Sequence, residues 1–282
     1  MSKNVFDGDE GLTTDSIRKY LRTKKLGRDI HFLPRTDSTQ TIGKSLAGTG
    51  AEEGLLVVAD SQYKGRGRHS HTWESPEKVN LYYSLLFRPK NPFWPLRRAN
   101  EIQFMSSLAV AEGLKKHCQV QVDLKWPNDL RLNGKKIGGI ILTTSSPNPK
   151  QLDYVLMGMG LNVNASEEDF SEEIKKIATS LFQITQKKLN RPMLLAYLLN
   201  EIEDHYELLQ SKGFSAIQKD WIKWASHMVN ENIHLQDVLV DPKDTLLNEL
   251  QGKAKGIDGQ GRLLVETSDG KTLAVIDGML VS

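Results

Sequence analysis

The chain has 282 residues, of which 39% are hydrophobic and 26% charged, and its formal net charge is only +2. This composition is typical of a globular protein, and the length can hold one large and one smaller domain. The near-neutral charge argues against a nucleic-acid-binding protein. A single cysteine, Cys118, excludes an internal disulfide, and no Cys/His spacing resembles a metal site. Because no apolar run suits a signal peptide or a membrane span, we expect a soluble, cytoplasmic protein.

The N-terminal part of the chain predicts short elements. Residues 1–12 are polar and acidic and are expected to be disordered. A short helix capped by Thr13 or Thr14 should follow and end near Gly27. Residues 30–34 are predicted to form a strand. Asp37-Ser38-Thr39-Gln40 then resembles a helix start, where hydroxyl groups either cap the helix or face a ligand beside the free backbone N–H groups.

A long basic loop joins two apolar, strand-like runs at residues 55–59 and 80–87. It contains residues 62–76, QYKGRGRHSHTWESP. Long ordered loops are commonly functional, glycine lets the backbone approach a ligand, and lysine and arginine suit phosphate or carboxylate. The pattern predicts a flexible loop that closes over a small anionic ligand, with a plain solvated surface loop as the alternative.

The middle of the chain alternates between helix and strand patterns. Residues 98–117 predict a long amphipathic helix. Cys118 follows the same pattern and is expected to be a small, semi-buried residue rather than a nucleophile. A strand at 120–124 leads into Lys125-Trp126-Pro127-Asn128-Asp129-Leu130, and Asn133-Gly134 predicts a hairpin turn before a returning strand at 135–142. Gly158 and Gly160 interrupt a strand at 154–163, which indicates that another group approaches its backbone closely.

The C-terminal third changes from helices to strands. One predicted helical stripe consists of Ile174, Ile177, Ala178 and Leu181, and a second helix has Pro192 near its start. After Met228, short strands at 233–240, 251–257, 262–266 and 272–276 predict a small β-barrel. We therefore expect one domain at residues 1–227 and a β domain at residues 228–282.

These motifs, in this order, resemble those of the biotin protein ligases, or biotin–[acetyl-CoA-carboxylase] ligases. They are Asp37-Ser38-Thr39, Gln62 with Gly65-Arg66-Gly67-Arg68 and Trp73, Ser75-Pro76, Asn80-Leu81-Tyr82, Lys125-Trp126-Pro127-Asn128-Asp129-Leu130, Lys136-Ile137-Gly138-Gly139-Ile140, and Gly158-Met159-Gly160-Leu161-Asn162-Val163-Asn164. The resemblance covers about residues 14–282. It implies an α/β (α+β) fold with a mixed-sheet catalytic domain of the biotin/lipoate ligase type and a C-terminal SH3-like barrel.

The resemblance also implies a two-step reaction. Biotin's carboxylate attacks the α-phosphate of ATP, with Mg²⁺, and gives biotinyl-5′-AMP. A lysine of the biotin carboxyl carrier protein of acetyl-CoA carboxylase then attacks this anhydride. Two alternatives stay open: ligation of lipoate or another short acid, and non-catalytic binding of biotin or biotinyl-AMP. Lys-Trp-Pro-Asn-Asp argues against the first, and the presence of Lys136 and Arg68 argues against the second.

The resemblance assigns roles to particular residues. Lys136 and Arg68 would be catalytic: Lys136 would bridge carboxylate and α-phosphate, and Arg68 would hold the loop closed. Without the neighbouring motif, Lys136 would be interpreted as a solvent-exposed lysine of a hairpin. The residues expected to meet biotin are Ser38, Thr39, Gln40, Gln62, Arg66, Gly67, Arg68, Lys136 and Gly138. Those expected to meet ATP or the adenylate are Trp73, Asn128, Asn162 and His71.

The sequence departs from the family pattern at four positions. His69, Ser70 and His71 stand where the family usually has a basic stretch rich in arginine, and Gln40 stands where it commonly has asparagine. These departures concern the triphosphate contacts and one biotin contact. The stretch before residue 30 has no room for a winged helix-turn-helix domain, so DNA binding is not expected. The resemblance leaves open whether the protein forms a homodimer.

Overall fold

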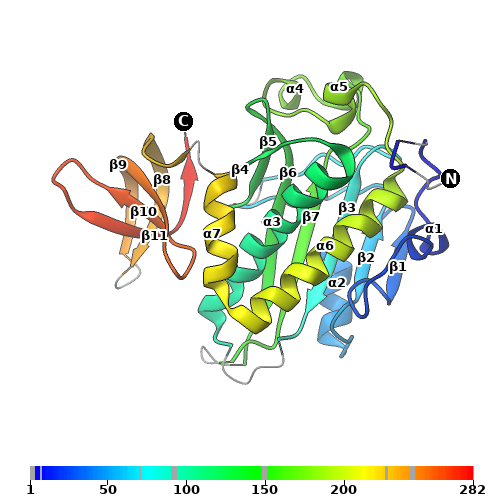
Figure 1. Ribbon diagram of the computed structural model, residues 1–282, viewed down its shortest axis with the longest axis horizontal. Helices are drawn as coiled ribbons and strands as arrows, with labels where there is room; N and C mark the ends of the chain where they lie inside the picture. Colours follow the sequence, from blue (N-terminus) through cyan, green and yellow to red (C-terminus); the bar gives the residue numbers. More distant parts are fainter. Residues whose placement is uncertain are drawn as a thin grey trace.

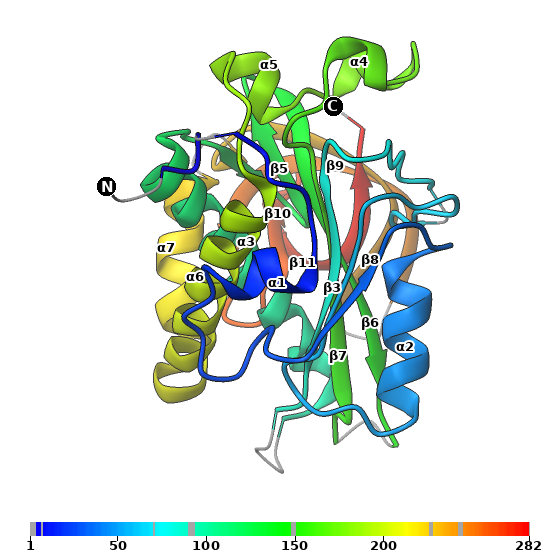
Figure 2. The ribbon, with the colours of Figure 1, turned by 90° about the vertical axis from the view of Figure 1, so that its right-hand side faces the viewer.

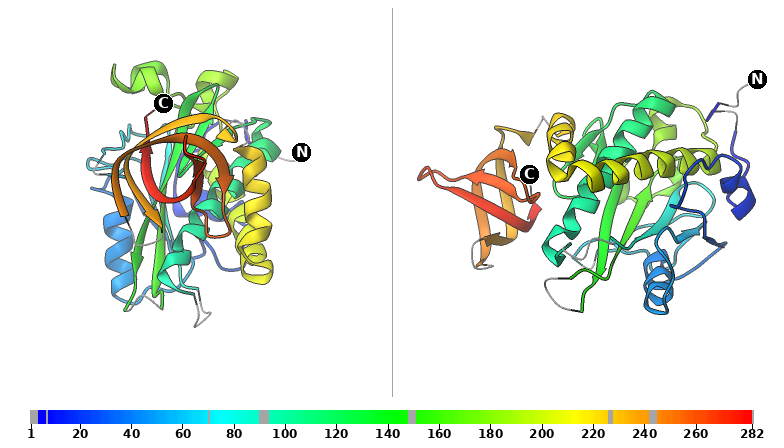
Figure 3. Two further views of the ribbon diagram at one scale, coloured as in Figure 1. Left: turned by 90° about the vertical axis from the view of Figure 1, so that its left-hand side faces the viewer. Right: turned by 60° about the horizontal axis from the view of Figure 1, so that its bottom comes forward.

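The computed structural model describes residues 4–6, 8–69, 71–89, 94–147, 151–225, 228–241 and 245–281. Its main body is a seven-stranded mixed sheet in the order β1-β2-β3-β7-β6-β5-β4, with helices on both faces (Figures 1 and 2). A closed four-stranded barrel stands at one end of this body (Figure 3). The predicted α/β fold with a C-terminal barrel is confirmed.

The sheet is built from the apolar runs that the sequence presents. Its strands are β1 (Ile30–Leu33), β2 (Leu56–Ala59), β3 (Leu81–Phe87), β4 (Asp123–Lys125), β5 (Asp129–Leu132), β6 (Lys135–Ser145) and β7 (Tyr154–Leu161). β1 and β2 are parallel, and the other neighbours are antiparallel. Every residue of β2 and β3 is buried. These strands are covered on both faces, which explains why their sequences are mostly apolar and do not alternate.

Helices cover the two faces of the sheet unequally. α2 (Thr39–Gly48) lies on one face, whereas α3 (Ala99–Cys118), α6 (Arg191–Lys212) and α7 (Phe214–Trp224) lie on the other (Figure 2). The predicted long helix at 98–117 is therefore confirmed as α3. Burial raises the pKa of the Cys118 thiol at its end to about 12, so this cysteine stays protonated and unreactive near neutral pH. Among the described residues, none of the helices is long and apolar enough to cross a membrane.

The N-terminal segment is ordered where the structure describes it, so the expected disorder of residues 1–12 is wrong for residues 4–6 and 8–12. Val5 and Leu12 are 2% and 3% exposed and belong to the main core. The Val5 carbonyl accepts a hydrogen bond from the Asn190 N–H at 2.7 Å. Asp9 forms an ion pair at 2.6 Å with Arg191, the first residue of α6. Single apolar residues in a polar segment give no periodic signal, so the packing of Val5 and Leu12 could not be predicted from the sequence.

The single helical stripe predicted around residues 174–181 is also wrong. It forms two short helices, α4 (Ile174–Ile177) and α5 (Leu181–Thr185), above the sheet (Figure 1). Ala178 between them forms a parallel bridge with Lys136, and the Thr179 N–H donates to the Lys136 carbonyl at 2.9 Å. Ser180 then caps α5. The extended segment at Ala178 and Thr179 therefore holds α4 and α5 next to β6, close to the predicted site residue Lys136.

The C-terminal barrel consists of β8 (Asn232–Asp241), β9 (Thr245–Ile257), β10 (Leu263–Glu266) and β11 (Thr272–Leu280), in the order β10-β11-β8-β9. Its buried interior is lined by alternate apolar residues, among them Leu235, Val238, Ala254, Val265 and Val275. Alternation of this kind is typical of a sheet with one face inside, and it confirms the four strands predicted from the sequence.

Candidate active site

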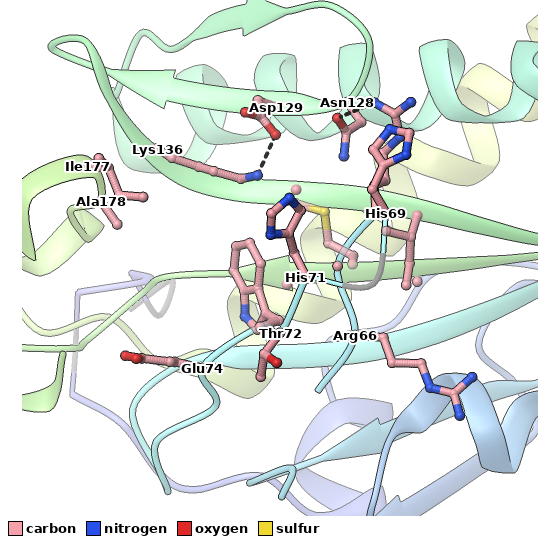
Figure 4. Close-up of a pocket in the computed structure, with 18 of the residues that line it drawn as sticks. Arg66, His69, His71, Thr72, Glu74, Asn128, Asp129, Lys136, Ile177 and Ala178 are labelled. Carbon is pink, nitrogen blue, oxygen red and sulfur yellow. Dashed lines mark hydrogen bonds and ion pairs between the residues drawn. The ribbon is translucent and has the colours of Figure 1, made fainter. Parts of the chain in front are cut away.

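A pocket of about 490 Å³ lies between the basic loop, the ends of β6 and β7, the segment around α4, and barrel strand β11 (Figure 4). It brings together nearly all of the predicted site residues: Ser38, Thr39, Gln40, Gln62, Arg66, Gly67, Arg68, His71, Trp73, Asn128, Lys136 and Asn162. Gly138 is not part of its lining. A Cβ at Gly138 would lie 3.1 Å from the Gly160 carbonyl oxygen, so this glycine allows β6 and β7 to pack.

The start of α2 forms one wall of the pocket. Ser38 is the N-cap, and its hydroxyl accepts a hydrogen bond from the backbone N–H of Gln40. The Gln62 side chain accepts from the Thr39 N–H at 2.9 Å and donates to the Ser75 hydroxyl at 3.0 Å. Burial alone would raise the pKa of Asp37, but hydrogen bonds, the strongest from the Ser38 N–H, outweigh it and lower the pKa. The capping role expected for this motif is confirmed, and the wall is a fixed polar network.

Gln40 lies at the buried end of this network. Its amide nitrogen donates to the Ser84 hydroxyl at 3.0 Å, and its amide oxygen accepts from Thr143 at 2.7 Å. Gly158 makes the arrangement possible, because a Cβ there would collide with the Gln40 amide. Both ends of the amide are satisfied within the protein, so the expected contact of Gln40 with biotin stays a prediction.

Trp73 packs against Gly160 on β7. A Cβ at Gly160 would overlap the indole ring, which confirms the close approach predicted for this strand. The Lys136 ammonium lies 5.5 Å from the ring centroid on the pocket side. The buried indole N–H of Trp73 has no hydrogen-bond partner among the described residues. A flat aromatic surface beside a cation is a suitable platform for a purine base.

The β5–β6 hairpin aims Lys136 into the pocket. Asn133 and Gly134 both have positive φ, 52° and 78°, as the predicted tight turn requires. Lys136 Nζ lies 2.5 Å from a carboxylate oxygen of Asp129 on the paired strand (Figure 4). The Asn128 amide donates to the Ile140 carbonyl at 2.9 Å, which leaves its oxygen directed at the basic loop. The hairpin and the residue just before it therefore bring a cation and an amide oxygen to the same pocket.

The basic loop forms a small hairpin over the pocket. Arg66 and Thr72 make an antiparallel bridge, and the Gly67 N–H donates to the His71 carbonyl at 2.7 Å. Arg68 donates to the Asn128 amide oxygen at 3.3 Å and forms an ion pair with Asp277 of the barrel. The Arg66 side chain instead points away from the Lys136 end of the pocket (Figure 4). Ser70, one of the departures from the family pattern, lies outside the described residues.

Asn162 lines the pocket, but its side chain is engaged by the protein. Its nitrogen donates to the Thr179 carbonyl at 3.1 Å, and its oxygen accepts from Asn80 at 3.3 Å. The amide therefore holds β7 to the segment before α5. Its expected contact with phosphate or metal stays a prediction.

The pocket has an excess of positive charge. Its lining includes the cations Arg66, Arg68, Lys125, Arg131 and Lys136, against the carboxylates Glu74 and Asp129. Burial, together with the nearby charge of Arg131, lowers the pKa of Lys125. The described part of the chain has no group of three His, Cys, Asp or Glu side chains that could hold a metal ion. Such a site suits a strongly anionic ligand and can screen the charge that builds up when two anions react.

Two carboxylates of the site were missed by sequence reasoning. Asp129 stands within the Lys-Trp-Pro-Asn-Asp motif, so its position was marked although its pairing with Lys136 was not expected. Asp277 has no motif around it, and only the folded barrel brings it to Arg68, 209 positions away in the sequence. No sequence signal could have identified it.

The fold and the pocket define a mixed α/β protein whose basic, glycine-containing loop and C-terminal barrel enclose an anion-binding site. Comparison with known proteins identifies the family. Residues 32–162 match the biotin/lipoate A/B protein ligase family, and residues 245–278 match the biotin protein ligase C-terminal domain. The bifunctional ligase/repressor BirA of Bacillus spizizenii is 36% identical over 259 residues, which cover 92% of this chain and 76% of that protein. The chain belongs to the biotin protein ligase family.

Two further relatives agree with this assignment. The biotin–[acetyl-CoA-carboxylase] ligase of Mycobacterium tuberculosis is 26% identical over 90% of this chain and 89% of its own length. The biotin protein ligase of Aquifex aeolicus, solved in complex with biotin and ATP, superposes with a TM-score of 0.73 at 29% identity and covers 90% of this chain and 98% of that chain. The family resemblance stated from the sequence motifs is confirmed.

Proposed function

We propose that this protein is a biotin–[acetyl-CoA-carboxylase] ligase, which activates biotin with ATP and transfers it to a lysine of the biotin carboxyl carrier protein. The observation that carries the proposal is the placement of Lys136, Arg68 and Trp73 around one cationic pocket. The Aquifex aeolicus relative was solved with biotin and ATP, and the Mycobacterium tuberculosis relative is named for acetyl-CoA carboxylase, which supports both substrates and acceptor.

In the first step, an oxygen of biotin's carboxylate forms a bond to the α-phosphorus of ATP as the bond to pyrophosphate breaks. Two anions must approach each other, and Lys136 lies in the pocket where its charge can offset both. Asp129 fixes the ammonium by its ion pair at 2.5 Å. The hydrogen-bonded wall of Ser38, Thr39 and Gln62 suits the polar ureido end of an otherwise apolar acid.

We propose that ATP enters as its magnesium complex. Because the described residues offer no cluster of three acidic, histidine or cysteine ligands, Mg²⁺ would be held chiefly by the nucleotide's own phosphates. Trp73 would stack on the adenine, and Arg68 and His71 would face the phosphates. The amides of Asn128 and Asn162 would line that side.

In the second step, a neutral lysine amine of the carrier protein attacks the biotinyl carbonyl, and AMP leaves as the acyl–oxygen bond to phosphate breaks. The enzyme needs no covalent nucleophile of its own. Cys118 lies buried at the end of α3, outside the pocket lining. Acceleration then comes from holding the reactants and from screening their charge. We also propose a catalytic domain at residues 1–227 and an SH3-like domain at residues 228–282.

A pyrophosphate-release assay with biotin, lipoate and octanoate tests this function. We expect release that depends on biotin and ATP together and that is weak or absent with the other acids. Equal or faster release with lipoate or octanoate would establish a different acyl ligase. Binding of biotin without any pyrophosphate release would establish a non-catalytic binder.

Gly160→Ala should raise the KM for ATP by about tenfold, because the added methyl group overlaps the Trp73 ring and must displace it from the proposed adenine platform. The affinity for biotin should change little. Gly48→Ala is the control: this residue ends α2 in open space and has helical geometry. If Gly160→Ala and Gly48→Ala have the same KM for ATP, Trp73 is not the platform for the adenine base.

His71→Arg should lower the KM for ATP by about threefold. His71 lines the pocket where the family usually has arginine, and a guanidinium at this position can form charge-assisted hydrogen bonds with the phosphates. The affinity for biotin should stay nearly constant. A KM for ATP equal to that of the wild type would show that position 71 does not meet the phosphates.

A further inference from the structure

The basic loop is tied to the C-terminal barrel as well as to the catalytic sheet. The guanidinium of Arg68 forms an ion pair with Asp277 on β11, and His69 Nε2 lies 3.8 Å from the same carboxylate oxygen. On its other side the guanidinium reaches the amide oxygen of Asn128 at 3.3 Å. Arg68 is therefore held between a catalytic-domain amide and a barrel carboxylate.

The barrel strand is distorted where it presents this carboxylate. The pairing of β11 with β8 is irregular on both sides of Asp277, between Val275 and Asp277 and again between Asp277 and Met279. On the facing strand, Asp237 has a positive φ of 50°. Irregularities of this kind redirect a side chain out of the regular alternation of a strand. The backbone N–H of Gly278 donates to the Asp277 carboxylate at 2.7 Å and fixes its orientation.

The barrel is itself fastened to the main body, so Asp277 is a firm anchor. The buried indole of Trp126 donates to the Gly261 carbonyl of the barrel at 3.4 Å, and its backbone N–H lies 3.1 Å from the sulfur of Met228. Gln218 of α7 donates to the Ile257 carbonyl of β9 at 2.7 Å. These contacts come from well-separated parts of both domains. They oppose rotation of the barrel about its link to the sheet.

The residues that follow Asp277 reach the pocket. Gly278, Met279 and Leu280 line it together with the basic loop, so loop and barrel meet at its edge. Both ends of the Arg68–Asp277 pair are partly exposed, with side chains 23% and 40% accessible. A pair of this kind is screened by salt and has a modest strength, which suits a contact that must open when substrates enter and leave.

We propose that Asp277 is a positioning residue that holds Arg68, and with it the basic loop, over the bound acyl-adenylate. Through this carboxylate the C-terminal barrel controls how long the activated acid is retained. The inference deepens the proposed function and rests on it. Asp277 lies outside the pocket lining, so its loss should change the release of the intermediate more than its formation.

The test is the release rate of chemically prepared biotinyl-5′-AMP from the full-length protein, measured by chase with excess unlabelled ligand. We expect release about threefold faster in Asp277→Asn, about tenfold faster in Asp277→Arg, and close to wild type in Asp277→Glu, as befits a partly screened ion pair. The matched control is Asp241→Asn. Asp241 is also 40% exposed on the barrel, but it pairs with Arg262, outside the pocket lining. Its release rate should be that of wild type.

A salt series separates positioning from a general loss of structure. Added salt should speed release from the wild type, and the dependence should be shallower in Asp277→Asn, which has already lost the pair. Equal release rates in wild type and Asp277→Asn would overturn the inference, as would equal acceleration by Asp241→Asn or identical salt slopes. A wild-type protein that makes no biotinyl-5′-AMP would instead contradict the proposed function, and the inference with it.

Discussion

Replacing Lys136 by alanine should slow the formation of biotinyl-5′-AMP by about a hundredfold or more. The ammonium is the cation that the β5–β6 hairpin directs into the pocket, and it would offset the negative charge of both reacting groups. Removing such a preorganised charge costs about 3 kcal/mol of transition-state stabilisation. The loss should exceed that of simple charge removal, because the Asp129 carboxylate, now 2.5 Å from the ammonium, would be left without its partner.

The measurement is pyrophosphate release in a single turnover with saturating biotin and ATP. Lys135→Ala is the matched control, because Lys135 lies one position earlier on the same hairpin and donates to the Lys175 carbonyl outside the pocket. We expect that variant to retain nearly full activity. A near-normal rate in Lys136→Ala, or an equal loss in the control, would remove Lys136 from the proposed mechanism.

Arg68→Gly should still make the adenylate but should fail to keep it. Without the guanidinium the loop loses its contacts with both Asn128 and Asp277, and water and free amines gain access to the anhydride. The released biotinyl-5′-AMP should then label lysines on unrelated proteins, an effect larger than that expected for any Asp277 variant.

Mass spectrometry of bystander proteins mixed with the enzyme, biotin and ATP measures this labelling. Lys64→Ala is the control, because Lys64 belongs to the same loop but is exposed and lies outside the pocket lining. Labelling that stays at the wild-type level in Arg68→Gly would show that Arg68 does not close the loop.

Much of the fold follows from local patterns in the sequence. The mostly apolar runs formed the central strands, Asn133-Gly134 formed the tight turn, and the glycines of β7 make room for Gln40 and Trp73. The wrong predictions of secondary structure result from tertiary contacts. Ala178 lies within a helical pattern but is drawn into a bridge with Lys136, which splits the helix in two.

The residues of the site also fall into those that the sequence could predict and those that it could not. Residues that stand in compact motifs could be found because sequence neighbours remain neighbours in space, as in the hairpin that carries Asn128 and Lys136. Contacts between distant segments could not be found. Trp126 stands in the Lys-Trp-Pro-Asn-Asp motif, yet its indole joins the sheet to the barrel by donating a hydrogen bond to the Gly261 carbonyl. Asp277 reaches Arg68 only because the barrel packs against the sheet.

The most direct test of the proposed function is to mix the protein with biotin and MgATP, remove small molecules by rapid gel filtration, and identify what stays bound. We predict protein-bound biotinyl-5′-AMP, which disappears when a biotin carboxyl carrier protein is added, as AMP is released and one carrier lysine is biotinylated. Recovery of unreacted biotin and ATP, or of an adenylate that the carrier protein does not discharge, would contradict it.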